Sequence, residues 1–292
     1  MTDAWHPPVA PRAGAHPAKA APAQRQPAPA LPAAPRTRPT PHPAWGLLLP
    51  ALALALLEAS ARLGWVPPHL LPPPSEIART LAQLAQGGEL VGHLLASSTR
   101  VAAGFAIGAL LAIMVGALVG LNRRAAALLD PSFQALRAIP SLAWVPLLLL
   151  WLGIDEAPKL TLIAIGAFFP VYMGVSSGFR DVDRKLVEVA ELAGLRPAAL
   201  VRRVLLPAAL PAVLTGLRNG LSLAWMFMVA AELIAATRGL GYLLTDGRET
   251  GRADVVLAAI VLLAVLGKLS DTAMQALERR WLAWRDTLET RA

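Results

Sequence analysis

Long apolar stretches constrain this chain more than any other feature of its sequence. Several stretches of about 20 residues carry few charged side chains, which is the length an α-helix needs to cross a bilayer. Of the 292 residues, 55% are hydrophobic and only 16% are charged, whereas soluble proteins carry about a quarter charged residues. Backbone polar groups in lipid must be paired within the segment, as they are in a helix. We therefore predict an all-α integral membrane protein with six transmembrane helices, over approximately residues 45–63, 97–121, 130–153, 160–179, 208–236 and 255–277.

The positive charges indicate the topology. The net charge is +8, but Lys and Arg lie in short segments that flank the apolar stretches, and residues 180–203 are the richest of these. This distribution follows the positive-inside rule and does not form the basic stripe of a nucleic-acid binder. We predict a multi-pass membrane protein with the N-terminus, the C-terminus and residues 180–203 in the cytoplasm. Because the chain has no cysteine, disulfides and thiolate metal sites are excluded.

The first 43 residues differ in composition from the rest of the chain. They are rich in Ala and Pro, so they have little to bury and cannot form regular structure. We predict a disordered cytoplasmic tail over residues 1–43 and a transmembrane domain over residues 44–292. The tail is not expected to be a signal peptide, because its apolar stretch comes too late. A second interpretation is that its arginines contact anionic lipid.

Residues 181–207 form a polar island in the apolar chain and are expected to fold as two short helices. Apolar residues recur at helical spacing over the first half, and Asp183 is placed to cap the helix N-terminus. Gly194 is placed to end this first helix, because glycine adopts a left-handed conformation at low cost. Pro197 suits the first turn of the second helix, and Pro207 is expected to close it.

Two further local features predict structure. The pairs Gly104/Gly108 and Gly116/Gly120 follow a small-xxx-small pattern, which lets helices approach closely in lipid. Ser75 is expected to cap an amphipathic helix over residues 76–86.

The polar island carries the pattern E-x-A-x3-G-x9-V-x-L-P, formed by Glu188, Ala190, Gly194, Val204, Leu206 and Pro207. This pattern resembles the cytoplasmic coupling loop of importer-type ABC transporter permeases, although that family usually has alanine where this chain has Val189. The stretch LPPPSEIARTL after the first apolar segment is similar to the nitrate, taurine and sulfonate branch of the family. The final stretches VLGKLSD and LERRWLAWRD most resemble aliphatic sulfonate permeases. The resemblance extends from about residue 45 to about residue 285.

The resemblance implies the type I importer permease fold, with a core region over residues 90–280, and a homodimer that encloses the transport path. It also implies two cytoplasmic ABC ATPase subunits, which bind ATP and Mg²⁺, and a substrate-binding protein on the outer side. The six pattern residues then belong to the loop that couples ATP hydrolysis to transport. The implied cargo is a small organic anion, most similar to aliphatic sulfonates, with taurine, nitrate and bicarbonate as alternatives.

The sequence contains no arrangement of residues that indicates catalysis or a bound cofactor. The five histidines, His6, His16, His42, His69 and His93, have no metal-ligand spacing. No phosphate-binding loop of the G-x4-G-K-[ST] type is present, so the chain is expected to take its energy from a partner and not to be an enzyme itself. The alternatives are a membrane-embedded enzyme, for which paired acids or an activated serine are missing, and a secondary transporter, for which no internal repeat is found.

Ionisable residues inside apolar segments are costly and therefore indicate function. An anionic cargo favours a cationic path, and prolines such as Pro140 and Pro146 inside a span are tolerated against protein or a water-filled path. The alternative is that these charges pair with each other, as Lys268 could with Asp271. The candidate residues of the substrate path are Arg137, Trp144, Arg218, Trp225 and Glu232.

Overall fold

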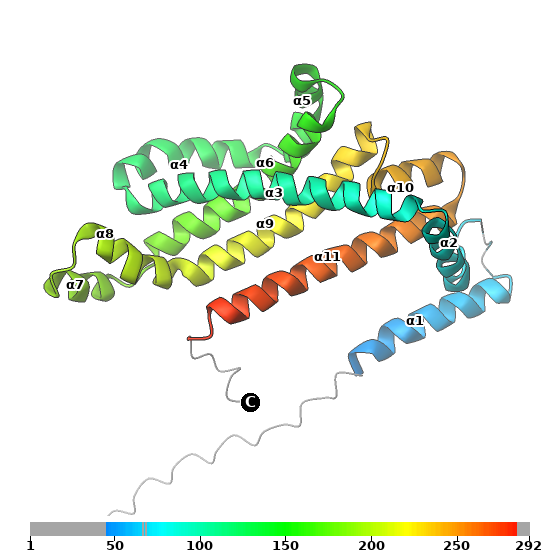
Figure 1. The fold of residues 1–292 in the computed structure, drawn as a ribbon, viewed down its shortest axis with the longest axis horizontal. Coiled ribbons are helices and arrows are strands. Elements are labelled where there is room, and N and C mark those ends of the chain that lie inside the picture. The colour runs from blue at the N-terminus through cyan, green and yellow to red at the C-terminus, as the bar shows by residue number, and fades with distance from the viewer. Residues whose placement is uncertain (1–44, 66, 68, 285–292) are drawn as a thin grey trace, which may run out of the picture. The chain divides into compact units, whose positions relative to one another are not determined.

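The computed structural model describes residues 45–65, 67 and 69–284, and within these residues the regular structure consists of helices alone. The predicted tail over residues 1–43 lies outside the described residues. The elements are α1 (Trp45–Arg62), α2 (Pro74–Gln86), α3 (Glu89–Leu121), α4 (Arg123–Ala138), the 3₁₀ turn η1 (Ser141–Trp144), α5 (Val145–Leu152), α6 (Glu156–Arg180), α7 (Arg184–Leu192), α8 (Pro197–Leu200), the π-helical turn η2 (Val201–Leu205), α9 (Leu206–Ala235), α10 (Leu240–Glu249) and α11 (Ala253–Trp281) (Figure 1).

Four helices in the described part of the chain are long and apolar enough to cross a membrane. They are α3, α6, the continuous run Pro197–Ile234 that includes nearly all of α9, and α11. The pair formed by α4 and the segment Ser141–Leu152 gives a fifth crossing if it is counted as one span, but it bends by 87°. The predicted span over residues 130–153 is therefore not one helix. Pro140 explains the break, because a proline disfavours helical backbone at the preceding residue. The count of six crossings stays a prediction.

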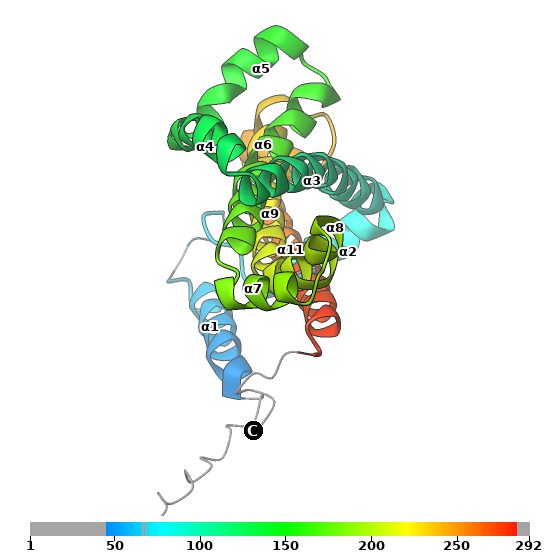
Figure 2. The ribbon, with the colours of Figure 1, turned by 90° about the vertical axis from the view of Figure 1, so that its left-hand side faces the viewer.

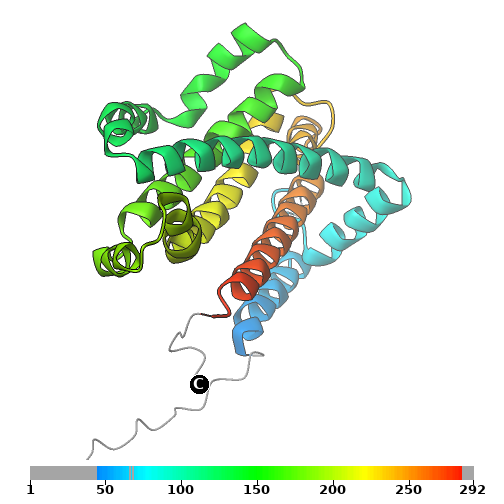
Figure 3. The same cartoon turned by 60° about the vertical axis from the view of Figure 1, so that its left-hand side comes forward.

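The core of the fold is α6, which packs against α3 on one side and α9 on the other. Figure 3 shows α6 and α9 crossing α3 at an angle, and Figures 1 and 2 show α4 and α5 on the opposite side of α3 from α11. We call the end of this core that carries α10 the α10 end. The opposite end, which carries α7 and α8, is the α7 end.

Glycines on α3 allow its close approach to α6. A Cβ atom added at Gly104 would lie 2.6 Å from Ile163, and one added at Gly120 would lie 2.8 Å from Phe179. At Gly108 the added atom would overlap the backbone carbonyl of Ala164, which cannot rotate away. The predicted close packing of the small-xxx-small pairs is confirmed.

The polar island forms the predicted pair of short helices, α7 and α8. Asp183 caps α7 by accepting a hydrogen bond from the backbone N–H of Lys185 (2.9 Å). Gly194 ends it with φ of +72°, a left-handed value, and the next residue donates its N–H back to the Ala190 carbonyl (3.1 Å). Pro207, however, does not close the second helix. The chain passes through η2 directly into α9, because a proline in the first turn of a helix removes no hydrogen bond that the turn needs.

Ser75 has a different role from the predicted one. Helix α2 begins at Pro74, and the N-cap position belongs to Pro73. The backbone N–H and the hydroxyl of Ser75 donate instead to the Glu58 carboxylate, at 3.1 and 2.9 Å. These bonds hold the end of α1 against the start of α2.

Candidate functional site

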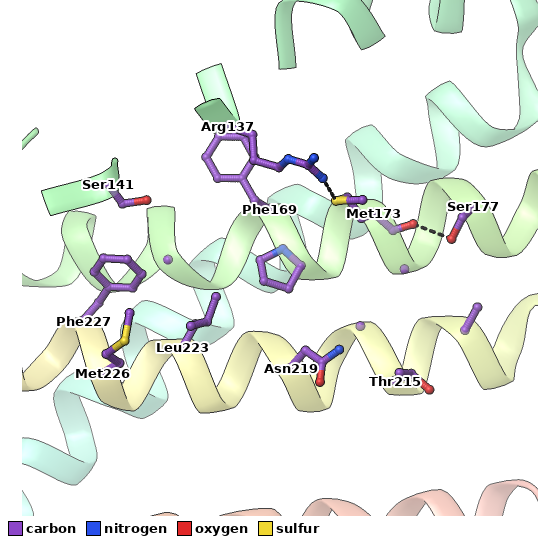
Figure 4. A pocket seen from close by; sticks show the side chains of 15 residues that line it. Arg137, Ser141, Phe169, Met173, Ser177, Thr215, Asn219, Leu223, Met226 and Phe227 are labelled. Carbon is purple, nitrogen blue, oxygen red and sulfur yellow. Dashed lines mark hydrogen bonds between the residues drawn. The ribbon is translucent and has the colours of Figure 1, made fainter. Parts of the chain in front are cut away.

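A cavity of about 680 Å³ with a mainly apolar wall lies between the end of α4 and the facing sides of α6 and α9 (Figure 4). Gly166 and Gly174 of α6 and Gly216 of α9 lie along its wall, where α6 and α9 approach closely, since a Cβ atom added at Gly174 would lie 2.7 Å from Gly216. We call it the main cavity. Its other lining residues are Arg137, Ser141, Phe169, Pro170, Met173, Ser177, Ala212, Thr215, Asn219, Leu223, Met226 and Phe227.

Arg137 is the charged residue of the main cavity wall. Its guanidinium contacts the sulfur of Met173 (Figure 4). Among the described residues, no carboxylate lies within 4.0 Å of it. The hydroxyl of Thr215 and the amide of Asn219 add hydrogen-bonding groups to the same cavity. The wall therefore presents one uncompensated positive charge and several neutral polar groups, which suits a small anion.

A smaller cavity of about 360 Å³ adjoins the main cavity toward the α7 end. The two share Arg137, Phe169, Met173 and Ser177. We call the smaller one the inner cavity. Its other lining residues are Asp130, Phe133, Gln134, Tyr172, Ser176, Arg180 and Asp181.

A compact polar cluster closes one side of the inner cavity. The Arg180 guanidinium lies 2.5 Å from the Asp130 carboxylate, and the Tyr172 hydroxyl donates to the same carboxylate at 2.5 Å. Asp130 belongs to α4, whereas Arg180 is the last residue of α6. The cluster thus joins the two helices just before the chain enters the polar island.

Only one of the five predicted path residues, Arg137, lies at the main cavity. Arg218 pairs with Asp271 of α11 (2.6 Å), and Trp225 donates its indole N–H to Ser270 (2.9 Å). Trp144 lines a separate, apolar cavity of about 410 Å³. Substrate contact by these residues stays a prediction, and the structure does not bring the five together.

The fifth path residue, Glu232, lies in a buried ionic cluster at the α10 end. Its side chain is fully buried and accepts a hydrogen bond from Arg100 of α3 (2.7 Å). Arg100 also pairs with Glu156 at the start of α6 (2.7 Å) and donates to the Arg238 carbonyl (2.6 Å). One guanidinium therefore joins α3, α6, α9 and the turn before α10.

The start of α10 is bound by side chains of the same region. Three successive backbone N–H groups, of Gly239, Leu240 and Gly241, donate to His93 Nδ1 (3.0 Å), the Ser97 hydroxyl (2.8 Å) and the Glu232 carboxylate (2.8 Å) respectively. These would otherwise be unpaired groups of a helix N-terminus. We call Arg100, Glu156, Glu232, Ser97 and His93 the α10-end cluster.

Sequence reasoning missed the α10-end cluster. A signal was available, because Arg100 and Glu232 are opposite charges inside two different apolar segments and therefore need partners. Their separation of 132 positions along the chain hid the pairing. His93 has no metal-ligand spacing in the sequence, and in the structure its Nδ1 accepts a backbone hydrogen bond from Gly239.

The α2–α11 contact is stabilised by a smaller polar group outside the core. Asp254 accepts from the Thr80 hydroxyl and from the Arg252 guanidinium, both at 2.7 Å. The hydrogen bond to Asp254 raises the pKa of Arg252, which precedes α11, above its ordinary value.

The predicted coupling residues lie on α7, in the turn after it, on η2 and in the first turn of α9. Ala190 is buried, and Glu188 pairs with Arg184 on the same helix (2.8 Å). Apolar side chains of α7 point into solvent, and Leu192 is 89% exposed. The other such residues are Leu186 and Val189. An exposed apolar face on a charged hairpin is typical of a binding surface.

Comparisons with known proteins agree with this architecture. Residues 105–283 match the family described as binding-protein-dependent transport system inner membrane component. The chain is 45% identical over 244 residues to the aliphatic sulfonates transport permease protein SsuC of Bacillus subtilis, covering 84% of this chain and 88% of the relative. It is 42% identical to SsuC of Escherichia coli, covering 81% and 90%, and 38% identical to the taurine transport system permease protein TauC of the same organism, covering 82% and 89%. A structure of the MetNI methionine ABC transporter in an inward-facing conformation matches with a TM-score of 0.58 and 23% identity, over 68% of this chain and 98% of that one.

Proposed function

Since the chain belongs to the family of binding-protein-dependent transport inner membrane components, we propose that it imports aliphatic sulfonates as the permease subunit of an ATP-driven transporter. The substrate class is proposed from the sequence identity of 45% and 42% to two sulfonate permeases over more than four fifths of the chain. The main cavity supports it, because Arg137 offers a sulfonate group a guanidinium that no carboxylate of the described residues occupies.

The proposed assembly contains two copies of this chain, two cytoplasmic ABC ATPase subunits that bind ATP and Mg²⁺, and an external substrate-binding protein. The exposed face of α7, formed by Leu186, Val189 and Leu192, supports docking of the ATPase, because these side chains gain most from burial. In this arrangement the α7 end faces the cytoplasm and the α10 end faces outward, as the positive-inside rule predicts. The inner membrane of a bacterium is the proposed location.

The proposed transport path runs through the main cavity and is completed by the second copy of the chain. ATP binding draws the ATPase subunits together, and the hairpin of α7 and α8 transmits this movement through η2 into α9. Because α9 supplies Thr215 and Asn219 to the cavity wall, such a movement changes the shape of the cavity itself. Outward and inward opening of the same site then gives alternating access.

Taurine is the second candidate substrate, because a taurine permease is among the similar proteins. Taurine carries an ammonium group as well as a sulfonate. The residues that line the main cavity include a guanidinium and no carboxylate, so they provide a counter-charge for the sulfonate and none for the ammonium. This asymmetry favours simple alkanesulfonates over taurine.

The experiment is uptake into proteoliposomes that contain the purified permease, its ATPase and its binding protein. We expect ATP-dependent uptake of labelled ethanesulfonate that exceeds uptake of taurine, nitrate and bicarbonate. Replacing Arg137 with Gln removes a charge-assisted hydrogen bond, and we expect a loss of about tenfold or more in uptake with normal assembly. Uptake that continues without the ATPase would contradict the proposed class, and preference for another anion would contradict the proposed substrate.

A further inference from the structure

The inner cavity has a property that the main cavity lacks, which is a cation already paired with an anion of the protein. Arg180 is held by Asp130 at 2.5 Å, and its side chain remains 39% exposed. A carboxylate and a sulfonate present similar oxygen atoms to a guanidinium, so one can replace the other on Arg180. The pair is therefore an anion site that is filled by the protein's own carboxylate.

The path from Arg137 to this pair is continuous along one face of α6. Phe169, Met173, Ser177 and Arg180 recur at helical spacing and all line the inner cavity, and the first three also line the main cavity. Met173 and Arg180 are separated by seven residues, which is about 10 Å along a helix axis. A long side chain such as arginine covers a large part of that distance.

We propose that the inner cavity is the release site for the transported sulfonate, which moves from Arg137 to Arg180 and displaces Asp130. This inference rests on the proposed function. Asp130 then competes for Arg180 and expels the anion, so that the site does not retain its cargo. Asp181, a second carboxylate that lines the cavity, lowers the affinity of the site for the anion.

The ion pair of Arg180 and Asp130 lies next to the hairpin of α7 and α8, so release of the sulfonate can affect this hairpin. Asp130 joins α4 to the last residue of α6, and Asp181 is the first residue of the polar island. When a sulfonate occupies Arg180, the contact between α4 and the end of α6 is lost. An anion in the inner cavity therefore alters the segment that leads to α7. Excess sulfonate on the side of the α7 end is then expected to slow ATP hydrolysis.

The experiment measures inhibition by sulfonate added on the side of the ATPase. Proteoliposomes of phosphatidylcholine, which has no net negative headgroup, carry the permease with its ATPase and binding protein, and ATP hydrolysis is followed as ethanesulfonate is increased. Asp130→Asn removes the competing carboxylate, and we expect the inhibitory concentration to fall about tenfold. Arg180→Gln removes the cation, and we expect it to rise by about the same factor. Added anionic lipid shows whether a lipid headgroup competes for the same site.

The double variant Asp130→Asn/Arg180→Gln keeps the test valid if a lone charge impairs folding. It leaves two neutral groups in place of the ion pair, and we expect weak inhibition by sulfonate when ATP hydrolysis is compared with the rate of the same variant without sulfonate. Arg79→Gln, at an exposed position of α2 outside both cavities and the hairpin, is the control and should leave the inhibitory concentration unchanged. Equal inhibition of the wild type, both single variants and the double variant would overturn the release site. Absence of sulfonate uptake by the wild type would instead contradict the proposed function.

Discussion

Two arginines, Arg100 of α3 and Arg137 of α4, have opposite surroundings. The Arg100 side chain is 10% exposed and is bound by Glu156 and Glu232, whereas Arg137 lines a cavity of about 680 Å³ and has no carboxylate within 4.0 Å among the described residues. A buried charge must be paired, since the cost of removing it from water is otherwise not recovered. The first arginine is therefore a structural element, and the second has its charge available for a ligand. An ionisable residue in an apolar helix indicates function only after its partners are known.

The two ends of the core differ in the same way. At the α10 end, three successive backbone N–H groups are all bound by side chains of the α10-end cluster. At the α7 end, the polar island is joined to α9 by the π-helical turn η2, and apolar side chains of α7 are exposed. π-Turns are frequent at functional sites because they disturb the regular hydrogen bonding of a helix. The contrast suits a core that is fixed at one end and moved at the other.

The largest expected effect comes from replacing Arg100 with Ala. This change leaves the buried carboxylate of Glu232 without its cation, which costs about 3–5 kcal/mol for a buried pair. We expect a large decrease in the thermal stability of the purified protein and poor assembly. The measurement is thermal unfolding in detergent, followed by circular dichroism.

Arg137→Ala is the matched control for Arg100→Ala. We expect it to unfold at nearly the wild-type temperature, because Arg137 has no ion pair to lose. The comparison fails if both variants are destabilised equally, since Arg137 would then be structural as well.

A smaller loss of stability is expected for Gly108→Ala. The added methyl group would meet the backbone carbonyl of Ala164, which forces α3 and α6 apart at a cost of about 1–3 kcal/mol. Gly92→Ala, on the same helix, meets no atom within 4 Å and should be neutral. If the two variants unfold at the same temperature, the glycines of α3 do not determine how closely α3 packs against α6.

The sequence predicts most of the helices but not how they are joined. The apolar stretches that form α3, α6, α9 and α11 are local features of the sequence. Each of these helices is found near its predicted range. The caps of α7 are equally local, so Asp183 and Gly194 are where the residue types place them. The chain bends at Pro140 but continues through Pro207. A proline is compatible with both a helix end and a helix start, and composition alone does not decide between them.

The candidate site is harder to predict than the fold for a related reason. Spacing along one segment cannot show that Glu232 meets Arg100, because the two lie on different helices. Arg137, Arg218 and Glu232 therefore looked equivalent in the sequence. The structure separates them by their partners, which are respectively a sulfur atom, Asp271 and the α10-end cluster.

Gly194→Val tests the proposed movement at the α7 end of the core. Valine at a left-handed φ costs about 1–2 kcal/mol, which the exposed turn tolerates, so membrane insertion should remain normal. The altered turn misplaces α7 relative to α8, and we expect ATP hydrolysis that no longer drives uptake. Gly251→Val is the matched control, because Gly251 also has a positive φ (+68°) and no atom near its Cβ position. Uptake at the wild-type rate in Gly194→Val would show that this turn does not transmit the movement.

The smallest effect is expected for Arg218→Ala, which tests the residue on which sequence and structure differ most. Arg218 was predicted to contact the anion, but its guanidinium pairs with Asp271 and its side chain is 37% exposed. An ion pair with this exposure contributes little to stability, so unfolding and ethanesulfonate uptake should both stay near wild type. A loss of uptake equal to that of Arg137→Gln, with normal assembly, would place Arg218 on the path. The pair with Asp271 would then have to open during transport, and Asp271→Asn, which removes the competing carboxylate, should increase the affinity for the anion.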